Sequence, residues 1–152
     1  MKAFGDLVDC LGSLPALPPP ERVDAGHGRL RVAIHAFAGS AEVARRLLSL
    51  RNVEVYFGIN AACLDGLSSK RRLSALTALP VDRVLLESDA HTFFDSNLRI
   101  RRAQDILSEQ YGIPSPEVLS KTTLNAVKWL FGSHTPCDTD TASCCRASAA
   151  GR

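Results

Sequence analysis

The sequence has no apolar run close to the roughly 20 residues that a membrane-spanning helix needs. Its first residues include acidic side chains, whereas a secretory signal begins with a basic region followed by an apolar one. These absences predict an intracellular protein, cytoplasmic or nuclear, that has no membrane partner.

The chain also lacks a strong excess of charge and a cysteine framework. Its formal net charge of +2 is too small to support nucleic-acid binding by bulk electrostatics, which requires clustered Lys and Arg. The five cysteines are odd in number and have no framework spacing, so free thiols are expected. The 152 residues, 45% of them hydrophobic, are enough for one domain with a sizeable core.

The end of the chain has no hydrophobic periodicity. From residue 133 to 152 the composition turns to Ser, Thr, Asp, Ala and Cys, which predicts a disordered tail after a domain at 1–132. A zinc site is the alternative for this tail, but its histidine and cysteines lack the paired spacing of zinc ligands. The candidate ligands of that alternative are His134, Cys137, Cys144 and Cys145.

Hydrophobic patterns between residues 30 and 89 alternate between the two kinds of element. They predict the order strand, helix, strand, helix, strand, which is typical of an α/β protein with parallel strands. The predicted strands cover 30–35, 53–60 and 84–87. Further helices are expected at 4–14, at 98–110 after a loop at 92–97, and from Pro116 to Leu130. The expected buried faces are Leu73, Leu76 and Leu79 before the third strand, and Leu119, Thr123, Ala126, Val127 and Leu130 in the last helix.

Two of the predicted strands lead into residues that can bind metals or move protons. The first strand ends at His35. The third ends at Glu87, and Asp89 and His91 follow shortly after it. In parallel sheets chemistry gathers at the carboxyl ends of strands. Glu87 and Asp89 are two residues apart, so on an extended chain they point to the same side and repel each other unless a proton or cation intervenes. The alternatives are a solvated loop after the third strand and a core histidine at position 35.

Three ordered motifs connect this pattern to a known family. They are His-Ala-Phe-Ala-Gly-Ser from His35, Glu-Ser-Asp-Ala from Glu87, and Thr-Thr-Leu-Asn-Ala-Val-Lys-Trp-Leu-Phe from Thr122. Together they make residues 30–132 resemble the TatD family of metal-dependent deoxyribonucleases. The resemblance implies the C-terminal part of a TIM-like (β/α) barrel, with three parallel strands and flanking helices, and therefore an incomplete barrel.

The resemblance also implies a cofactor and a substrate. Family members hydrolyse DNA or another phosphoester with two divalent ions, which can be zinc, magnesium or manganese. By motif, His35 matches a ligand of one ion, and Asp89 matches a ligand of the other and a candidate catalytic group for the attacking water. Glu87 matches a residue that supports the ligands. His91 replaces the family's Pro, so it is either a contact to substrate phosphate or metal, or an exposed loop histidine.

The sequence departs from the family in what precedes residue 30. The His-x-His strand, the bridging Glu and a further His have no counterpart there, and a complete barrel has about 250 residues. Two ligands are too few for a catalytic site, so the chain alone is expected to be inactive. The alternative is a non-catalytic half-barrel that binds a partner or a full-length relative. Open barrel edges also predict self-association. The arginines at 99, 101 and 102 are interpreted as a solvated face.

Overall fold

A computed structural model describes residues 2–15, 29–65 and 68–132, which contain all the predicted strands and helices. The expected disorder of 133–152 and the alternative zinc site at His134, Cys137, Cys144 and Cys145 lie outside the described residues.

Three parallel strands form one sheet, as the sequence predicted. They are β1 (Leu30–Ile34), β2 (Val53–Ile59) and β3 (Val84–Leu86), in the spatial order β1-β2-β3. Ile34 pairs with Phe57 and Ile59 pairs with Leu86, so all three strands end close to one edge of the sheet. This register brings the residues that follow the strands together.

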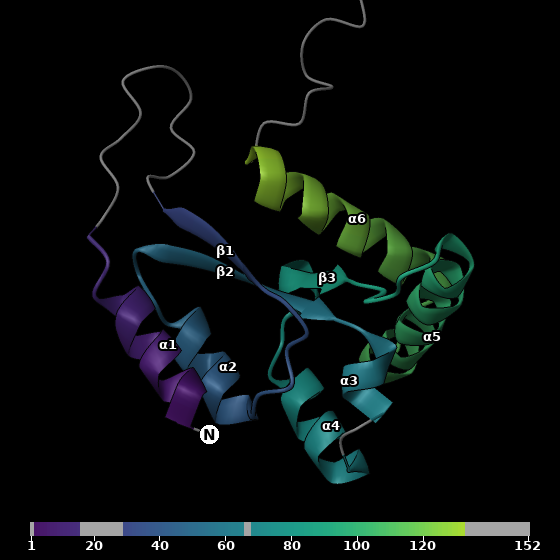
Figure 1. Cartoon of the computed structure of the whole chain (residues 1–152), viewed down its shortest axis with the longest axis horizontal. Coiled ribbons are helices and arrows are strands. Elements are labelled where there is room, and N and C mark those ends of the chain that lie inside the picture. Colours follow the sequence, from purple (N-terminus) through teal and green to yellow (C-terminus); the bar gives the residue numbers. More distant parts are fainter. Residues whose placement is uncertain (1, 16–28, 66–67, 133–152) are drawn as a thin grey trace, which may run out of the picture.

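Helices flank the sheet on two sides. The helices are α1 (Lys2–Gly12), α2 (Ala41–Leu48), α3 (Ala61–Asp65), α4 (Ser69–Thr77), α5 (Phe93–Tyr111) and α6 (Ser115–Phe131), with a 3-10 turn η1 (Val81–Arg83) before β3. In Figure 1, α1, α2 and α4 lie on one side of the sheet and α6 lies on the other, while α5 packs beside α6. The strands and their helices therefore form the α/β layout that the motifs implied.

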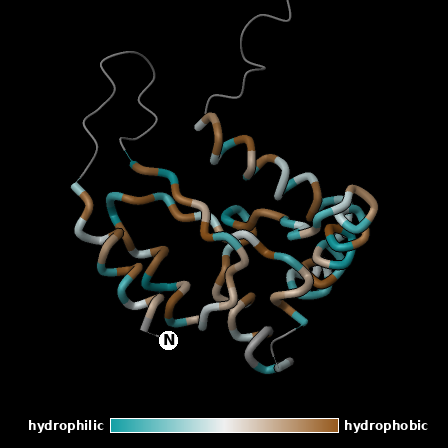
Figure 2. Tube along the Cα trace, viewed as in Figure 1, coloured by the Kyte–Doolittle hydropathy of each residue, from teal (hydrophilic) through white to brown (hydrophobic). Residues whose placement is uncertain are grey.

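The core fills the space between the sheet and the helices. Phe37 and Phe57 meet edge to face with ring centroids 4.9 Å apart, and Phe4 of α1 contacts Phe37 in the same way at 5.8 Å. Figure 2 shows hydrophobic and hydrophilic residues alternating along the helices, as expected when one side of each helix is buried. Phe37 thereby anchors the segment that follows His35.

Capping residues set the helix boundaries. Ser40 accepts a hydrogen bond from the backbone N–H of Val43 and starts α2. Thr92 accepts one from Asp95, so α5 begins at Phe93 and the expected loop at 92–97 is wrong. The hydrophobic pattern hid this start, because Phe93 and Phe94 are exposed. The short helix α3 also lies in a stretch where no element was predicted.

Two expected buried faces are only partly right. Leu73 is 58% exposed, while Leu76 and Leu79 are buried. In α6 the buried residues are Val118, Thr122 and Asn125, and the predicted Leu119, Thr123 and Leu130 are exposed. Hydrogen bonding explains this difference, since the Asn125 amide donates to the carbonyl oxygens of Val81 and Val84 at 2.8 Å each and turns that side of α6 toward β3.

Within the described residues, no helix is both long enough and apolar enough to span a membrane.

Candidate active site

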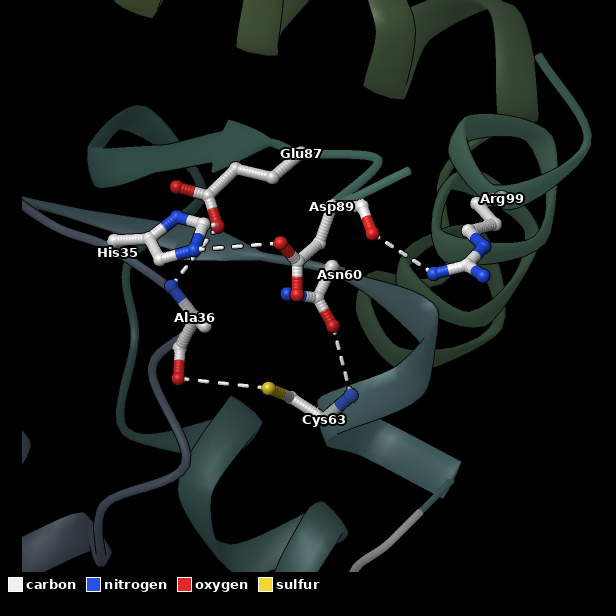
Figure 3. Close-up of polar contacts among 7 residues, drawn as sticks. All are labelled: His35, Ala36, Asn60, Cys63, Glu87, Asp89 and Arg99. Atoms are coloured by element: carbon white, nitrogen blue, oxygen red, sulfur yellow. Dashed lines mark hydrogen bonds and ion pairs between the residues drawn. The ribbon is translucent and has the colours of Figure 1, made fainter. Parts of the chain in front are cut away.

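Polar side chains follow all three strands where they end. His35 follows β1, Asn60 follows β2 and Glu87 follows β3, with Asp89 two residues further on. Figure 3 shows these four side chains gathered at one edge of the sheet. The three predicted residues His35, Glu87 and Asp89 are thus brought together, although His35 lies more than fifty positions before the other two.

His35 lies between two carboxylates. Its Nδ1 is 3.0 Å from Glu87 Oε2, and its Nε2 is 3.7 Å from Asp89 Oδ1. The His35 side chain is 66% exposed, which excludes the alternative of a core histidine. The hydrogen bond to Glu87 and the negative charge of Glu87 raise the pKa of His35, with a smaller contribution from the charge of Asp89.

Of the two carboxylates, that of Glu87 is held by more contacts. Its Oε2 also accepts a hydrogen bond from the backbone N–H of Ala36 at 2.9 Å. The side chain reaches these partners by lying across Gly58 of β2, where an added Cβ would overlap the carboxylate. Gly58 is therefore the position that lets a residue after β3 contact the end of β1.

Asp89 lies on a backbone turn. Its φ of 49° is in the left-handed region, which is uncommon for a residue other than glycine, so the extended chain assumed from the sequence is wrong here. Glu87 and Asp89 nevertheless converge on His35, on its two different nitrogens. The Arg99 side chain of α5 donates to the backbone oxygen of Asp89 at 2.9 Å and supports this turn. Arg99 was assigned to a solvated face, and its contact with the turn was missed.

His91 stands apart from this group. Its side chain is exposed, and it makes no hydrogen bond or ion pair with another residue of the described segments. Arg102 also stays outside the site, where it pairs with Asp65 at 3.8 Å. The exposure of His91 therefore favours the interpretation of this residue as an exposed loop histidine.

Asn60 and Cys63 belong to the same region and were missed. The Cys63 thiol lies 3.6 Å from the backbone oxygen of Ala36, and the Cys63 backbone N–H donates to Asn60 Oδ1 at 2.8 Å. Both described cysteines, Cys10 and Cys63, are free, as expected. The sequence offered one signal for Asn60. This residue stands at the end of a predicted buried strand, as His35 and Glu87 do.

The donor atoms fit part of a metal site. Protein nitrogen and oxygen ligands lie at about 2.0–2.2 Å from zinc, so two ligands of one ion are at most roughly 4.2 Å apart. His35 Nε2 and Asp89 Oδ1, at 3.7 Å, are therefore close enough to share one ion, whereas the family motifs match them to ligands of two different ions. Among the described side chains, however, no group of three or more His, Cys, Asp or Glu is arranged to hold an ion. The described residues thus bring two donor atoms within reach of one ion and place a carboxylate, that of Glu87, on the other nitrogen of His35.

A parallel sheet that gathers histidine and carboxylates at the carboxyl ends of its strands has the layout of metal-dependent hydrolases built on (β/α) barrels. Comparison with protein families agrees with this class, because residues 10–131 match the family of TatD related DNases. The chain belongs to this family, whose members are metal-dependent hydrolases that act on DNA or other phosphoesters. The match begins at Cys10, near the end of α1, and so starts before the motifs recognised in the sequence. A search of curated proteins finds no significant match.

Proposed function

We propose that this protein contributes His35 and Asp89 as ligands of divalent metal in a phosphodiester hydrolase site. The observation that carries the proposal is the 3.7 Å separation of His35 Nε2 and Asp89 Oδ1, together with the Glu87 contact on the other nitrogen of His35. Zinc, manganese and magnesium are the metals considered, because family members use divalent ions and these donors are nitrogen and carboxylate oxygen.

Glu87 prepares His35 for binding a metal. It accepts a hydrogen bond from Nδ1–H, which leaves the lone pair of the neutral ring on Nε2, the atom that faces Asp89. The second hydrogen bond of Glu87, from Ala36 N–H, fixes the carboxylate and therefore the ring. Carboxylates that orient a ligand histidine in this way raise its basicity as a ligand.

Asp89 is the proposed catalytic residue. A divalent ion held here would lower the pKa of the attacking water and would neutralise charge that develops on the phosphoryl oxygens. The Asp89 carboxylate is 55% exposed, so it is accessible to a substrate and can orient the attacking water by accepting its hydrogen bond. His91 lies two residues beyond Asp89 on the exposed loop and is proposed to contact substrate phosphate.

The ligand count sets the activity expected of the chain alone. A catalytic zinc site has three protein ligands, and a two-metal site has more, whereas the described residues offer two. The proposal is therefore that this chain forms part of a barrel site and is inactive without the other ligands. The same count favours a second candidate function, a non-catalytic half-barrel that binds a partner or a full-length relative.

Metal titration of the full chain tests the assignment of ligands. Zinc and manganese should bind by calorimetry no tighter than about micromolar, because the described residues provide two ligands and no third. Asp89→Asn and His35→Ala should each weaken that binding by tenfold or more. The matched control is Asp6→Asn, which removes an exposed carboxylate of α1 and should leave the affinity unchanged.

Hydrolysis of single-stranded DNA and of a chromogenic phosphodiester tests whether the chain completes a catalytic site by itself. We expect the chain to show no more turnover than Asp89→Asn. Turnover that depends on Asp89 would show that the chain completes its own site and would refute the limited ligand count. Equal metal affinity in the wild type, His35→Ala and Asp89→Asn would refute the proposed ligands themselves.

A further inference from the structure

Asn60 carries a buried hydrogen-bond donor that has no partner among the residues that the structure describes. The residue is fully buried, and its Oδ1 accepts the backbone N–H of Cys63 at 2.8 Å. Because that N–H requires an acceptor, the contact fixes which end of the amide is oxygen and which is nitrogen. Asn60 Nδ2 is buried without a hydrogen-bond partner in the described part of the molecule. A buried donor in this state costs free energy and calls for an explanation.

The position of Asn60 places this donor beside the candidate metal ligands. Asn60 follows β2, the middle strand, and Ile59 before it pairs with Leu86, so Asn60 is level with Glu87 at the strand ends. Figure 3 shows the amide nitrogen pointing away from Cys63 and toward the side of the site where the Asp89 carboxylate lies. The donor is thus directed at the site and away from the helix that Asn60 begins.

Asp89 has a free oxygen to receive such a donor. Its contact with His35 involves Oδ1, and its hydrogen bond with Arg99 involves the backbone oxygen. The described residues provide no hydrogen bond to the Asp89 carboxylate, although its backbone is held in a left-handed turn. Carboxylates that bind metals are in turn hydrogen-bonded by neighbouring groups, and this arrangement fixes their orientation.

We propose that Asn60 is a positioning residue of the site, whose Nδ2–H donates to the Asp89 carboxylate oxygen that does not bind metal. This inference rests on the proposed function, because it assigns a role to Asn60 through the ligand Asp89. It gives a role to an amide nitrogen that is buried without a hydrogen-bond partner among the described residues.

A second buried asparagine provides the contrast. Asn125 is also buried, but its Nδ2 donates to two backbone oxygens, those of Val81 and Val84. The amide nitrogen of Asn125 is therefore used by the fold. Loss of Asn125 should therefore affect stability alone, whereas loss of the Asn60 nitrogen should affect metal binding.

The first test is the zinc affinity of the full chain with Ser in place of each asparagine. Ser retains an oxygen that can accept the Cys63 N–H at the start of α3, but it has no amide nitrogen. Asn60→Ser should weaken zinc binding by tenfold or more, the usual effect of removing a group that orients a metal ligand. Asn125→Ser is the matched control and should stay within twofold of wild type. Circular dichroism confirms that each variant is folded under the binding conditions.

The second test uses the wild-type chain, so it does not depend on how a variant folds. The side-chain amide protons of Asn60 should move downfield in the NMR spectrum on zinc addition, because they gain an acceptor. Asp89→Ala should abolish this shift, and the side-chain amide of Asn125 should not move in either protein.

Different outcomes separate this inference from the proposed function. If Asp89→Ala weakens zinc binding while Asn60→Ser leaves it within twofold and the Asn60 amide does not respond to zinc, the positioning role is wrong. If Asp89→Ala also leaves zinc affinity unchanged, the failure lies in the assignment of Asp89 as a ligand. A shift of the Asn60 amide that persists in Asp89→Ala would likewise overturn the proposed acceptor.

Discussion

Gly58→Ala tests the arrangement of the site through a single added methyl group. Gly58 lies in β2, and its backbone is not in the left-handed region, so alanine is compatible with the main chain. The added Cβ would occupy the place of the Glu87 carboxylate. Because that carboxylate is the end of a flexible side chain, it moves away and the strand stays in place. The variant therefore removes the contacts of Glu87 with Ala36 and His35.

The expected loss of stability is about 1–2 kcal/mol. A hydrogen bond to a charged group, such as that from Ala36 N–H to Glu87, contributes about 1.5–3 kcal/mol. Replacing Gly by Ala within a strand returns roughly 0.5–1 kcal/mol, because glycine loses more conformational freedom on folding. The His35 contact adds little to the sum, since that ring is two-thirds exposed.

Urea unfolding and NMR titration of His35 together measure the effect. The free energy of unfolding should fall, and the pKa of His35 should drop toward its ordinary value, because the hydrogen bond to Glu87 that raises it is lost. Gly5→Ala is the control, since nothing lies within 4 Å of its added Cβ and alanine favours helix α1 by up to about 1 kcal/mol. Gly58→Ala with wild-type stability and an unchanged His35 titration would refute the placement of Glu87 across β2.

Three further predictions concern the fold. Asn125→Ala should lower the free energy of unfolding by about 2–4 kcal/mol, because two buried carbonyl oxygens lose their donor; an effect below 0.5 kcal/mol in urea unfolding would contradict this. The Tyr111 hydroxyl donates a hydrogen bond to the backbone oxygen of Leu79, and burial raises the pKa of this hydroxyl. The hydroxyl therefore contributes its full stabilisation below the pKa of about 10 that tyrosine has in the unfolded chain, and this stabilisation is lost as the pH rises further. Tyr111→Phe should reduce the decline of stability above pH 10, and an equal decline in both proteins would contradict it. Size-exclusion chromatography with light scattering at micromolar concentration should detect self-association through the outer edges of β1 and β3, whereas a monodisperse monomer would argue against it.

The strands and the predicted site residues could be found from the sequence because their signals are local. Each strand is a short apolar run, and His35 and Glu87 directly follow two of them. Parallel pairing then brings strand ends to one edge whatever the details of packing. The convergence of His35, Glu87 and Asp89 therefore follows from topology, even though the backbone at Asp89 differs from the extended chain assumed for it.

The missed features depend on contacts between distant residues. The amide of Asn125 binds the backbone of the segment around β3 and so determines which side of α6 is buried. A pattern based on apolar residues places this polar residue on the surface instead. Asn60 was missed because an asparagine after a strand is equally typical of a turn. Its unpaired nitrogen is evident once β2 is placed between β1 and β3.

The location of His35 after an edge strand has a consequence for local unfolding. β1 pairs with β2 alone, over five residues, while β2 is held by strands on both sides. Opening of β1 would separate His35 from Asp89 and leave β2 paired with β3, so the site depends on how firmly this edge strand is held. Zinc bound between His35 and Asp89 should in turn slow amide hydrogen exchange in β1 more than in α6, since it adds a link between the edge strand and the segment after β3.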